Sequence, residues 1–137
     1  MYTGFSEALN MLSKTEETYG YKMIIILSDG SDVPSTSYDS KYAPLVQQAN
    51  DNNIVVYTIG AGTSVDTSIL TKIATNTGGS YYNATVTSGI LDAFDQIQDE
   101  TVDLVTDTDK DGLPDYYEQN LTNSAGVPLN LDINDPD

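Results

Sequence analysis

The sequence predicts an α/β fold, in which a partial doubly wound parallel sheet of three strands is followed by a small acidic segment at the C-terminus. Along residues 1–101, apolar residues alternate between helical spacing and short unbroken runs. Helices and strands that alternate in this way form parallel sheets with right-handed crossovers. The composition then changes near residue 100, because residues 92–137 hold 13 of the 21 acidic side chains.

The first two predicted elements are a helix and a strand. Apolar residues at i, i+3, i+4 and i+7 predict a helix near the N-terminus, and Gly20 is placed to end it. One face of this helix carries Phe5, Ala8, Leu9 and Leu12. Residues 22–27 follow as a strand. Because residues 23–27 show no polar alternation, as is typical of a parallel strand covered on both faces, this strand is expected to be central.

The remaining apolar residues predict three more helices and two more strands. The strands cover residues 54–59 and 80–84. The helices are predicted around residues 42–49, over residues 66–75 with Asp66 as N-cap, and from residue 90 to residues 100–105. Their apolar faces consist of Tyr42, Leu45, Val46 and Ala49; Ile69, Leu70, Ile73 and Ala74; and Ile90, Ala93, Phe94 and Ile97.

The open side of the first strand predicts that the sheet is incomplete. Three strands make a poor independent sheet, and a strand that is apolar on both faces calls for a neighbour on each side. No segment between Met1 and Lys22 is suited to that role. We therefore expect an N-terminal part of the domain to be missing.

The composition excludes several classes of protein. The 137 residues carry a formal charge of −16, so nucleic acid and anionic membranes would be repelled. Without histidine or cysteine there is no imidazole base, thiolate nucleophile, disulfide or Cys/His zinc site. No apolar run approaches the roughly 20 residues of a membrane-spanning helix, so membrane insertion is not expected. These exclusions favour a protein that is not an enzyme.

Ser28-Asp29-Gly30 directly follows the first strand, where open α/β sheets bind ligands. Asp-Gly is also typical of an ordinary turn. In order and spacing, IIILSDG (24–30), IVVYTIGAG (54–62), ILTKIA (69–74), GGSYY (78–82) and ILDAFDQI (90–97) resemble the C-terminal half of a von Willebrand factor type A domain. This resemblance covers residues 1–101.

The resemblance implies a metal-ion-dependent adhesion site, which usually holds Mg²⁺. Its ligands come from an Asp-x-Ser-x-Ser loop, a threonine and the aspartate of Ser/Thr-Asp-Gly. Only the last maps here, onto Asp29, because Thr3 lies several residues out of register and the Asp-x-Ser-x-Ser strand is absent. Mg²⁺ demands near-octahedral oxygen coordination, so we expect Mg²⁺ only in the complete domain and no tight site at Asp29 alone.

Other features of this part have simpler interpretations. A phosphoacceptor aspartate needs a lysine at a later strand end, and the residues after the second and third strands offer none. The segment 60–62 is Gly-Ala-Gly, but Val65 stands where a dinucleotide fingerprint needs glycine. The tyrosine pairs at 81–82 and 116–117 are predicted to pack with their phenol groups at the surface.

The strongest chemical signal is DTDKDGLPDYYE, residues 107–118, which matches the twelve-residue calcium loop Asp-x-Asp-x-Asp-Gly-x-x-Asp-x-x-Glu. Calcium prefers six to eight hard oxygen ligands. The predicted donors are the carboxylates of Asp107, Asp109 and Asp111, the carbonyl of Leu113, Asp115 through water, and both oxygens of Glu118. Gly112 occupies the sharp turn. The alternative is an acidic, solvated linker.

Pro114 makes this EF-hand-like loop a solitary or serially stacked one, because proline has no N–H for the bridge between paired loops. It also predicts a short helix from Pro114 to about Asn120. The Asp-Gly-Leu-Pro-Asp pattern resembles the thrombospondin type 3-like calcium repeats of bacterial surface proteins. Such repeats recur in tandem, so Asp137 is expected to begin a possible next loop.

Together these features predict a type A segment (1–101), a linker (102–106) and a truncated calcium repeat (107–137). The expected function is non-catalytic calcium binding and adhesion within a secreted or cell-surface protein. Its partner would be a protein ligand, an extracellular matrix component or a cell-surface component. Two alternatives stay open: a regulatory or accessory module of a larger extracellular enzyme, and a purely structural spacer. An upstream Asp-x-Ser-x-Ser strand would favour adhesion.

Overall fold

A computed structural model of the chain describes residues 1–14, 21–30, 38–108, 110, 114–120, 126, 128, 129, 131 and 134, without the side chains of 39, 103–105, 117 and 120. The chain divides into two compact units. Unit 1 comprises Met1–Glu16 and Lys22–Ile97, and unit 2 comprises Glu17–Tyr21 and Gln98–Asp137.

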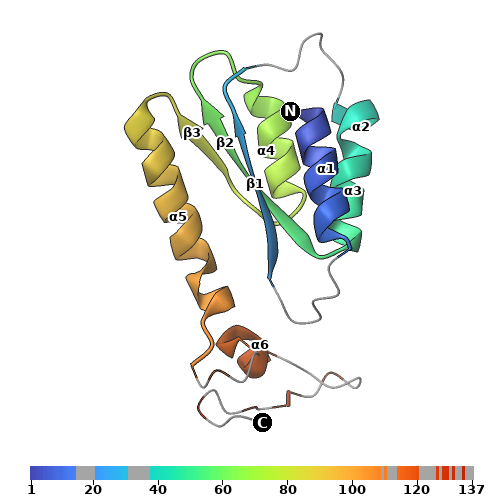
Figure 1. The fold of residues 1–137 in the computed structure, drawn as a ribbon, viewed down its shortest axis with the longest axis vertical. Helices are drawn as coiled ribbons and strands as arrows, with labels where there is room; N and C mark the ends of the chain where they lie inside the picture. The colour runs from blue at the N-terminus through green and yellow to red at the C-terminus, as the bar shows by residue number, and fades with distance from the viewer. Residues whose placement is uncertain are drawn as a thin grey trace. The chain divides into compact units, whose positions relative to one another are not determined.

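Unit 1 is built on a parallel sheet of three strands, as the sequence predicts, and the strand order is β1-β2-β3 (Figure 1). The strands are β1 (Lys22–Ser28), β2 (Ile54–Ala61) and β3 (Tyr81–Ala84). Among the described strands β2 is central and β1 lies at the edge, with the open side that the sequence analysis expects in the absence of an upstream strand. Ile24 and Ile26 of β1 are buried on one face of the sheet, whereas Met23 and Leu27, on the opposite face of the strand, are 39% and 52% exposed.

The helices are α1 (Tyr2–Leu12), α2 (Tyr38–Lys41), α3 (Ala43–Asp51), α4 (Thr67–Thr75), α5 (Thr87–Val105) and α6 (Asp115–Asn120). The four predicted helices of the first segment are present, and α6 confirms the short helix after Pro114. Two differences are that α1 already ends at Leu12 and that α2 was not predicted. Gly20 lies outside the described residues. Among the helices in the described ranges, none combines the length and hydropathy needed to span a bilayer.

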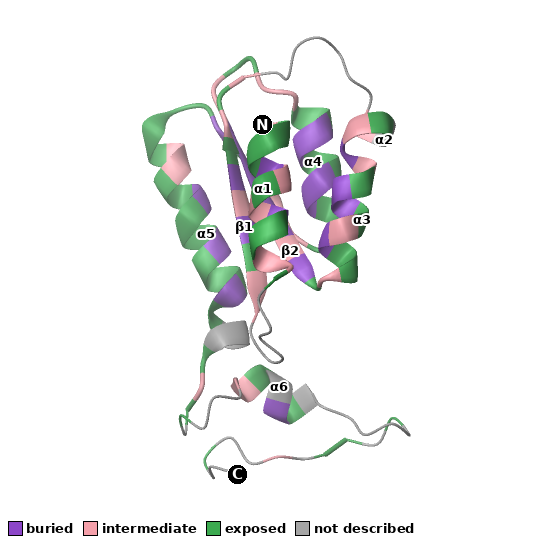
Figure 2. Ribbon diagram, turned by 45° about the vertical axis from the view of Figure 1, so that its right-hand side comes forward, coloured by how far each residue is buried: buried purple, intermediate pink, exposed green. Residues whose placement is uncertain are grey.

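Helices α1, α3 and α4 cover one face of the sheet, and α5 covers the other (Figure 1). The larger core lies on the first face, where Ile24, Ile26 and Val56 of the strands meet buried side chains of the three helices. The second core joins Tyr57 and Ile59 to α5. Figure 2 shows the buried residues on the sides of the helices that face the sheet.

The N-cap predicted for α4 is confirmed. Asp66 Oδ1 accepts a hydrogen bond of 3.1 Å from the backbone N–H of Ile69, which satisfies one of the free donors at the helix start. This cap fixes the chain that leads from the end of β2 into α4.

The buried face of α5 is narrower than predicted. Ala93 and Ile97 are buried, whereas Phe94 is 42% exposed. On a helix, residues 93 and 97 lie one above the other and residue 94 is turned away by about 100°. Among the described helices α5 alone covers this face of the sheet, so only the centre of the predicted apolar stripe contacts the strands.

Candidate functional site

Two candidate sites lie in different units: the carboxyl ends of the strands in unit 1 and the acidic loop in unit 2. In unit 1 the parallel register places Ser28 beside Gly60, and Gly60 beside Asn83. The chain therefore presents three strand ends at one edge of the sheet, with Asp29 exposed directly after β1.

The strand-end site does not fit Mg²⁺ on its own. Ser28 is engaged locally, since its hydroxyl donates a hydrogen bond of 3.0 Å to the carbonyl of Gly30. Within the ranges that the structure describes, no three aspartate, glutamate, histidine or cysteine side chains come together as a metal-binding group. A lone carboxylate does not supply the coordination that Mg²⁺ demands. No magnesium chemistry follows from Asp29 by itself.

Tyr81 packs against Gly60 at the strand end, a feature that the sequence did not indicate. A Cβ at Gly60 would lie 2.8 Å from the Tyr81 hydroxyl oxygen, so any side chain at residue 60 would require the Tyr81 ring to shift. The hydroxyl is buried, without a hydrogen-bond partner among the described residues, and burial raises the pKa of Tyr81. The predicted surface position of this phenol is therefore wrong.

In the acidic loop the structure describes Asp107, Asp115 and Glu118. The other predicted donors, Asp109, Asp111 and Leu113, lie outside the described residues, as do Gly112 and Asp137. The placement of the complete ligand set thus remains a prediction.

Glu118, the predicted closing ligand, lies on α6 and is 0% exposed. Both of its carboxylate oxygens are buried. Removing a carboxylate from water is costly, and buried carboxylates in proteins are paired with a charge or coordinate a metal. A buried glutamate at the last position of the loop has the chemistry that a calcium ligand requires.

Asp107, the predicted first ligand, opens a tight turn. Its Oδ1 accepts a hydrogen bond of 2.7 Å from the backbone N–H of Lys110. Lys110 adopts a φ of 64°, a left-handed conformation that is uncommon for a residue with a β-carbon. The sequence predicted a sharp turn at Gly112 and gave no indication that Lys110 would adopt a left-handed conformation.

Asp115 is bound at both carboxylate oxygens by Thr108. The Thr108 backbone N–H donates to Oδ1 at 2.7 Å, and the Thr108 hydroxyl donates to Oδ2 at 2.6 Å. These hydrogen bonds hold the pKa of Asp115 below its usual value, and the bond from the hydroxyl contributes most. The sequence predicted a water-mediated role for Asp115 and none for Thr108, which stands between two ligand positions.

Comparisons with solved structures support the fold of unit 1. An uncharacterized membrane spanning protein from Vibrio fischeri shares 27% identity with a TM-score of 0.52, over 69% of this chain and 55% of that chain. A von Willebrand factor type A protein from Catenulispora acidiphila shares 20% identity with a TM-score of 0.54, over 73% of this chain and 22% of that chain. The chain therefore spans about half the length of the Vibrio fischeri protein and about a fifth of the Catenulispora acidiphila protein. No curated protein matches it.

The family model of the von Willebrand factor type A domain matches residues 1–100. The match covers all elements of unit 1. Domains of this family are generally non-catalytic and mediate protein interactions. On this evidence, the chain belongs to the von Willebrand factor type A domain family.

Proposed function

We propose that the chain is a non-catalytic adhesion segment of a secreted or cell-surface protein, in which a calcium repeat stiffens the chain after the type A domain. Its partner would be a protein ligand or a component of the matrix or cell surface. The observation that carries the calcium part of this proposal is the burial of Glu118 at the closing position of a complete twelve-residue loop pattern.

Asp107 and Glu118 would hold the ion from the two ends of the loop, together with Asp109, Asp111 and the carbonyl of Leu113. Bound calcium would neutralise the carboxylates that otherwise repel one another within one turn. The loop and α6 would then form a rigid segment, as a stalk requires.

Adhesion through the strand-end edge would require more than this chain supplies. Asp29 would be one ligand of a Mg²⁺ site that is complete only in the whole type A domain, together with an Asp-x-Ser-x-Ser loop. The exposed position of Asp29 at the carboxyl edge is compatible with that role.

A calcium titration tests the proposal, with binding measured by calorimetry and structure measured by far-ultraviolet circular dichroism. We expect a single site with a Kd on the order of 10⁻⁴ M, in the range of extracellular modules, and a gain of ordered structure. The double variant Asp109→Ala/Glu118→Ala should show neither. Asp92→Ala/Asp95→Ala removes two exposed carboxylates from α5 and should bind like the parent. No heat and unchanged spectra with the parent would refute the calcium loop.

A Mg²⁺ titration of the same protein examines the strand-end loop. We expect no second, magnesium-selective site. A magnesium site that disappears in Asp29→Ala would show that this loop binds the ion without the rest of the domain.

A further inference from the structure

We propose that Thr108 and Asp115 form a clasp that closes the calcium loop before the ion binds, so that Asp115 acts as a positioning residue. This inference rests on the proposed calcium function. The Thr108–Asp115 clasp is defined by the hydroxyl and backbone N–H of Thr108 and the two carboxylate oxygens of Asp115.

Three hydrogen bonds join the start of the loop to the start of α6. Two are donated by Thr108 to Asp115, at 2.7 Å from the backbone N–H and 2.6 Å from the hydroxyl. In the third, the backbone N–H of Asp115 donates to the carbonyl of Thr106 at 2.8 Å. Asp115 thus contacts Thr106 through its backbone N–H and Thr108 through its side chain. These are the residues on either side of Asp107.

The two contacts from Thr108 occupy both oxygens of the Asp115 carboxylate. Each has the short distance of a hydrogen bond to an ionised acceptor, and such bonds are about twice as strong as neutral ones. An ionised carboxylate has about four acceptor sites, so the two bonds leave room for a water, but they fix the orientation of the Asp115 group against Thr108. The geometry therefore favours a role in shaping the loop.

The clasp links the first and last predicted ligands. Asp107 lies between Thr106 and Thr108, and Glu118 lies three residues after Asp115 on the same helix. Fixing Asp115 against both threonines restricts the span between these two carboxylates. A loop that is already closed loses less conformational entropy when the ion binds, which raises affinity. Residues that orient metal ligands in this way typically change metal affinity by about 10- to 100-fold when mutated.

Variants that remove or keep the Thr108 hydroxyl test the clasp most directly. Thr108→Val removes this donor while keeping the size of the side chain, and we expect calcium to bind about tenfold more weakly. Thr108→Ser retains the donor and should restore the parent affinity. If Thr108→Val binds like the parent, or if Thr108→Ser does not rescue, the clasp does not position the ligands.

Replacements of Asp115 separate positioning from a direct effect of its charge on the ion. Asp115→Asn keeps an oxygen for the Thr108 N–H and presents an amide group, from which the hydroxyl can accept a hydrogen bond. These neutral bonds are weaker than those to the carboxylate, so this variant should lose less affinity than Asp115→Ala. Asp115→Ala should lose affinity as Thr108→Val does. If Asp115→Asn and Asp115→Ala lose calcium affinity equally and Thr108→Val loses none, Asp115 acts on the ion through its charge and not through the clasp.

Amide hydrogen exchange in the calcium-free protein gives a readout that does not depend on the metal. We expect the Thr108 N–H to be protected in the parent and to exchange at least about tenfold faster in Asp115→Ala, because the acceptor is gone. An unprotected Thr108 N–H in the parent would overturn the clasp. If this amide is protected while the parent binds no calcium, the proposed function fails and the clasp stands as a contact of the fold.

Discussion

Gly79→Ala is expected to lower the free energy of unfolding by about 3 kcal/mol, because residue 79 packs directly on the backbone of β2. A Cβ at this position would lie 2.2 Å from the carbonyl oxygen of Val56 and 3.2 Å from a methyl carbon of Val55. A backbone carbonyl within a central strand cannot yield as a flexible side chain does. The segment between α4 and β3 would have to move away from the sheet. Urea unfolding followed by circular dichroism measures this loss.

Gly4→Ala is the matched control, because it makes the same chemical change where there is space. Gly4 lies in α1, and a Cβ there would meet nothing within 4 Å. Alanine favours the helix over glycine by up to about 1 kcal/mol, so this variant should be as stable as the parent or slightly more stable. Unfolding of Gly79→Ala at the urea concentration of Gly4→Ala would contradict the packing of residue 79 on β2.

Ile59→Ala is expected to cost about 2–5 kcal/mol, because Ile59 is the centre of the core between β2 and α5. Its side chain is 0% exposed, and of the helices that the structure describes, α5 is the one that covers this face. Removing three carbons would leave a cavity that a single helix cannot close without losing its other contacts. Ile59→Val should cost about 1 kcal/mol, which gives a graded series in urea unfolding.

Leu91→Ala is the matched comparison, since it truncates a side chain of α5, the helix that packs on Ile59. Leu91 belongs to α5 but is 65% exposed, so its truncation should change stability by less than about 0.5 kcal/mol. If Ile59→Ala proves as mild as Leu91→Ala, α5 does not pack on β2 as described.

The parts of the fold that could be predicted from the sequence depend on local or strongly periodic signals. The apolar run of β2 and the spacing in α4 each identify an element without knowledge of its neighbours. The N-cap at Asp66 involves a residue only three positions away, so its chemistry is visible in the sequence. The calcium loop rests on a signal of the same local kind, since its proposed donors are spaced along one segment, and it stays a prediction.

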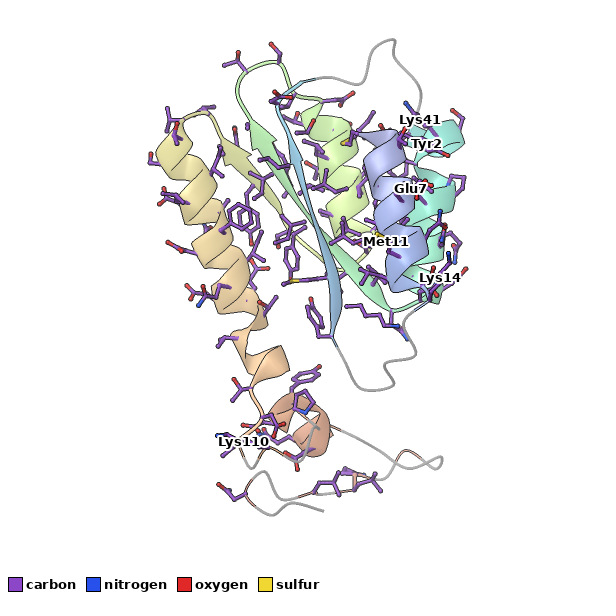
Figure 3. All side chains as sticks on the ribbon, viewed as in Figure 1. Tyr2, Glu7, Met11, Lys14, Lys41 and Lys110 are labelled. Carbon is purple, nitrogen blue, oxygen red and sulfur yellow. The ribbon has the colours of Figure 1, made fainter. Side chains whose placement is uncertain are left out.

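Helix α2 could not be predicted, because distant residues stabilise it. It has four residues and no apolar periodicity. The Nζ of Lys41 lies 5.3 Å from the centre of the Tyr2 ring in α1 (Figure 3). The hydroxyl of Tyr38 accepts a hydrogen bond of 2.8 Å from the side-chain amide of Asn76. These contacts join residues about forty positions apart, which no local pattern reveals.

The details of the candidate sites were missed for a related reason. Sequence spacing identifies Asp115 as a loop position, but it does not show that the hydroxyl of Thr108 binds its carboxylate. Likewise, the Tyr81 hydroxyl is buried where Gly60 on the neighbouring strand leaves space for it. In both cases the partner is fixed by the path of the chain, and not by the identity of the residue.

A crystal structure of the protein grown with millimolar calcium would show whether the acidic loop surrounds an ion. We expect one calcium ion bound by six to eight oxygen atoms at about 2.3–2.6 Å, with Asp107 and both oxygens of Glu118 among them and Asp115 still held by Thr108. A loop without an ion at that concentration, or carboxylates of Asp107 and Glu118 directed away from each other, would contradict a calcium-binding repeat in this chain.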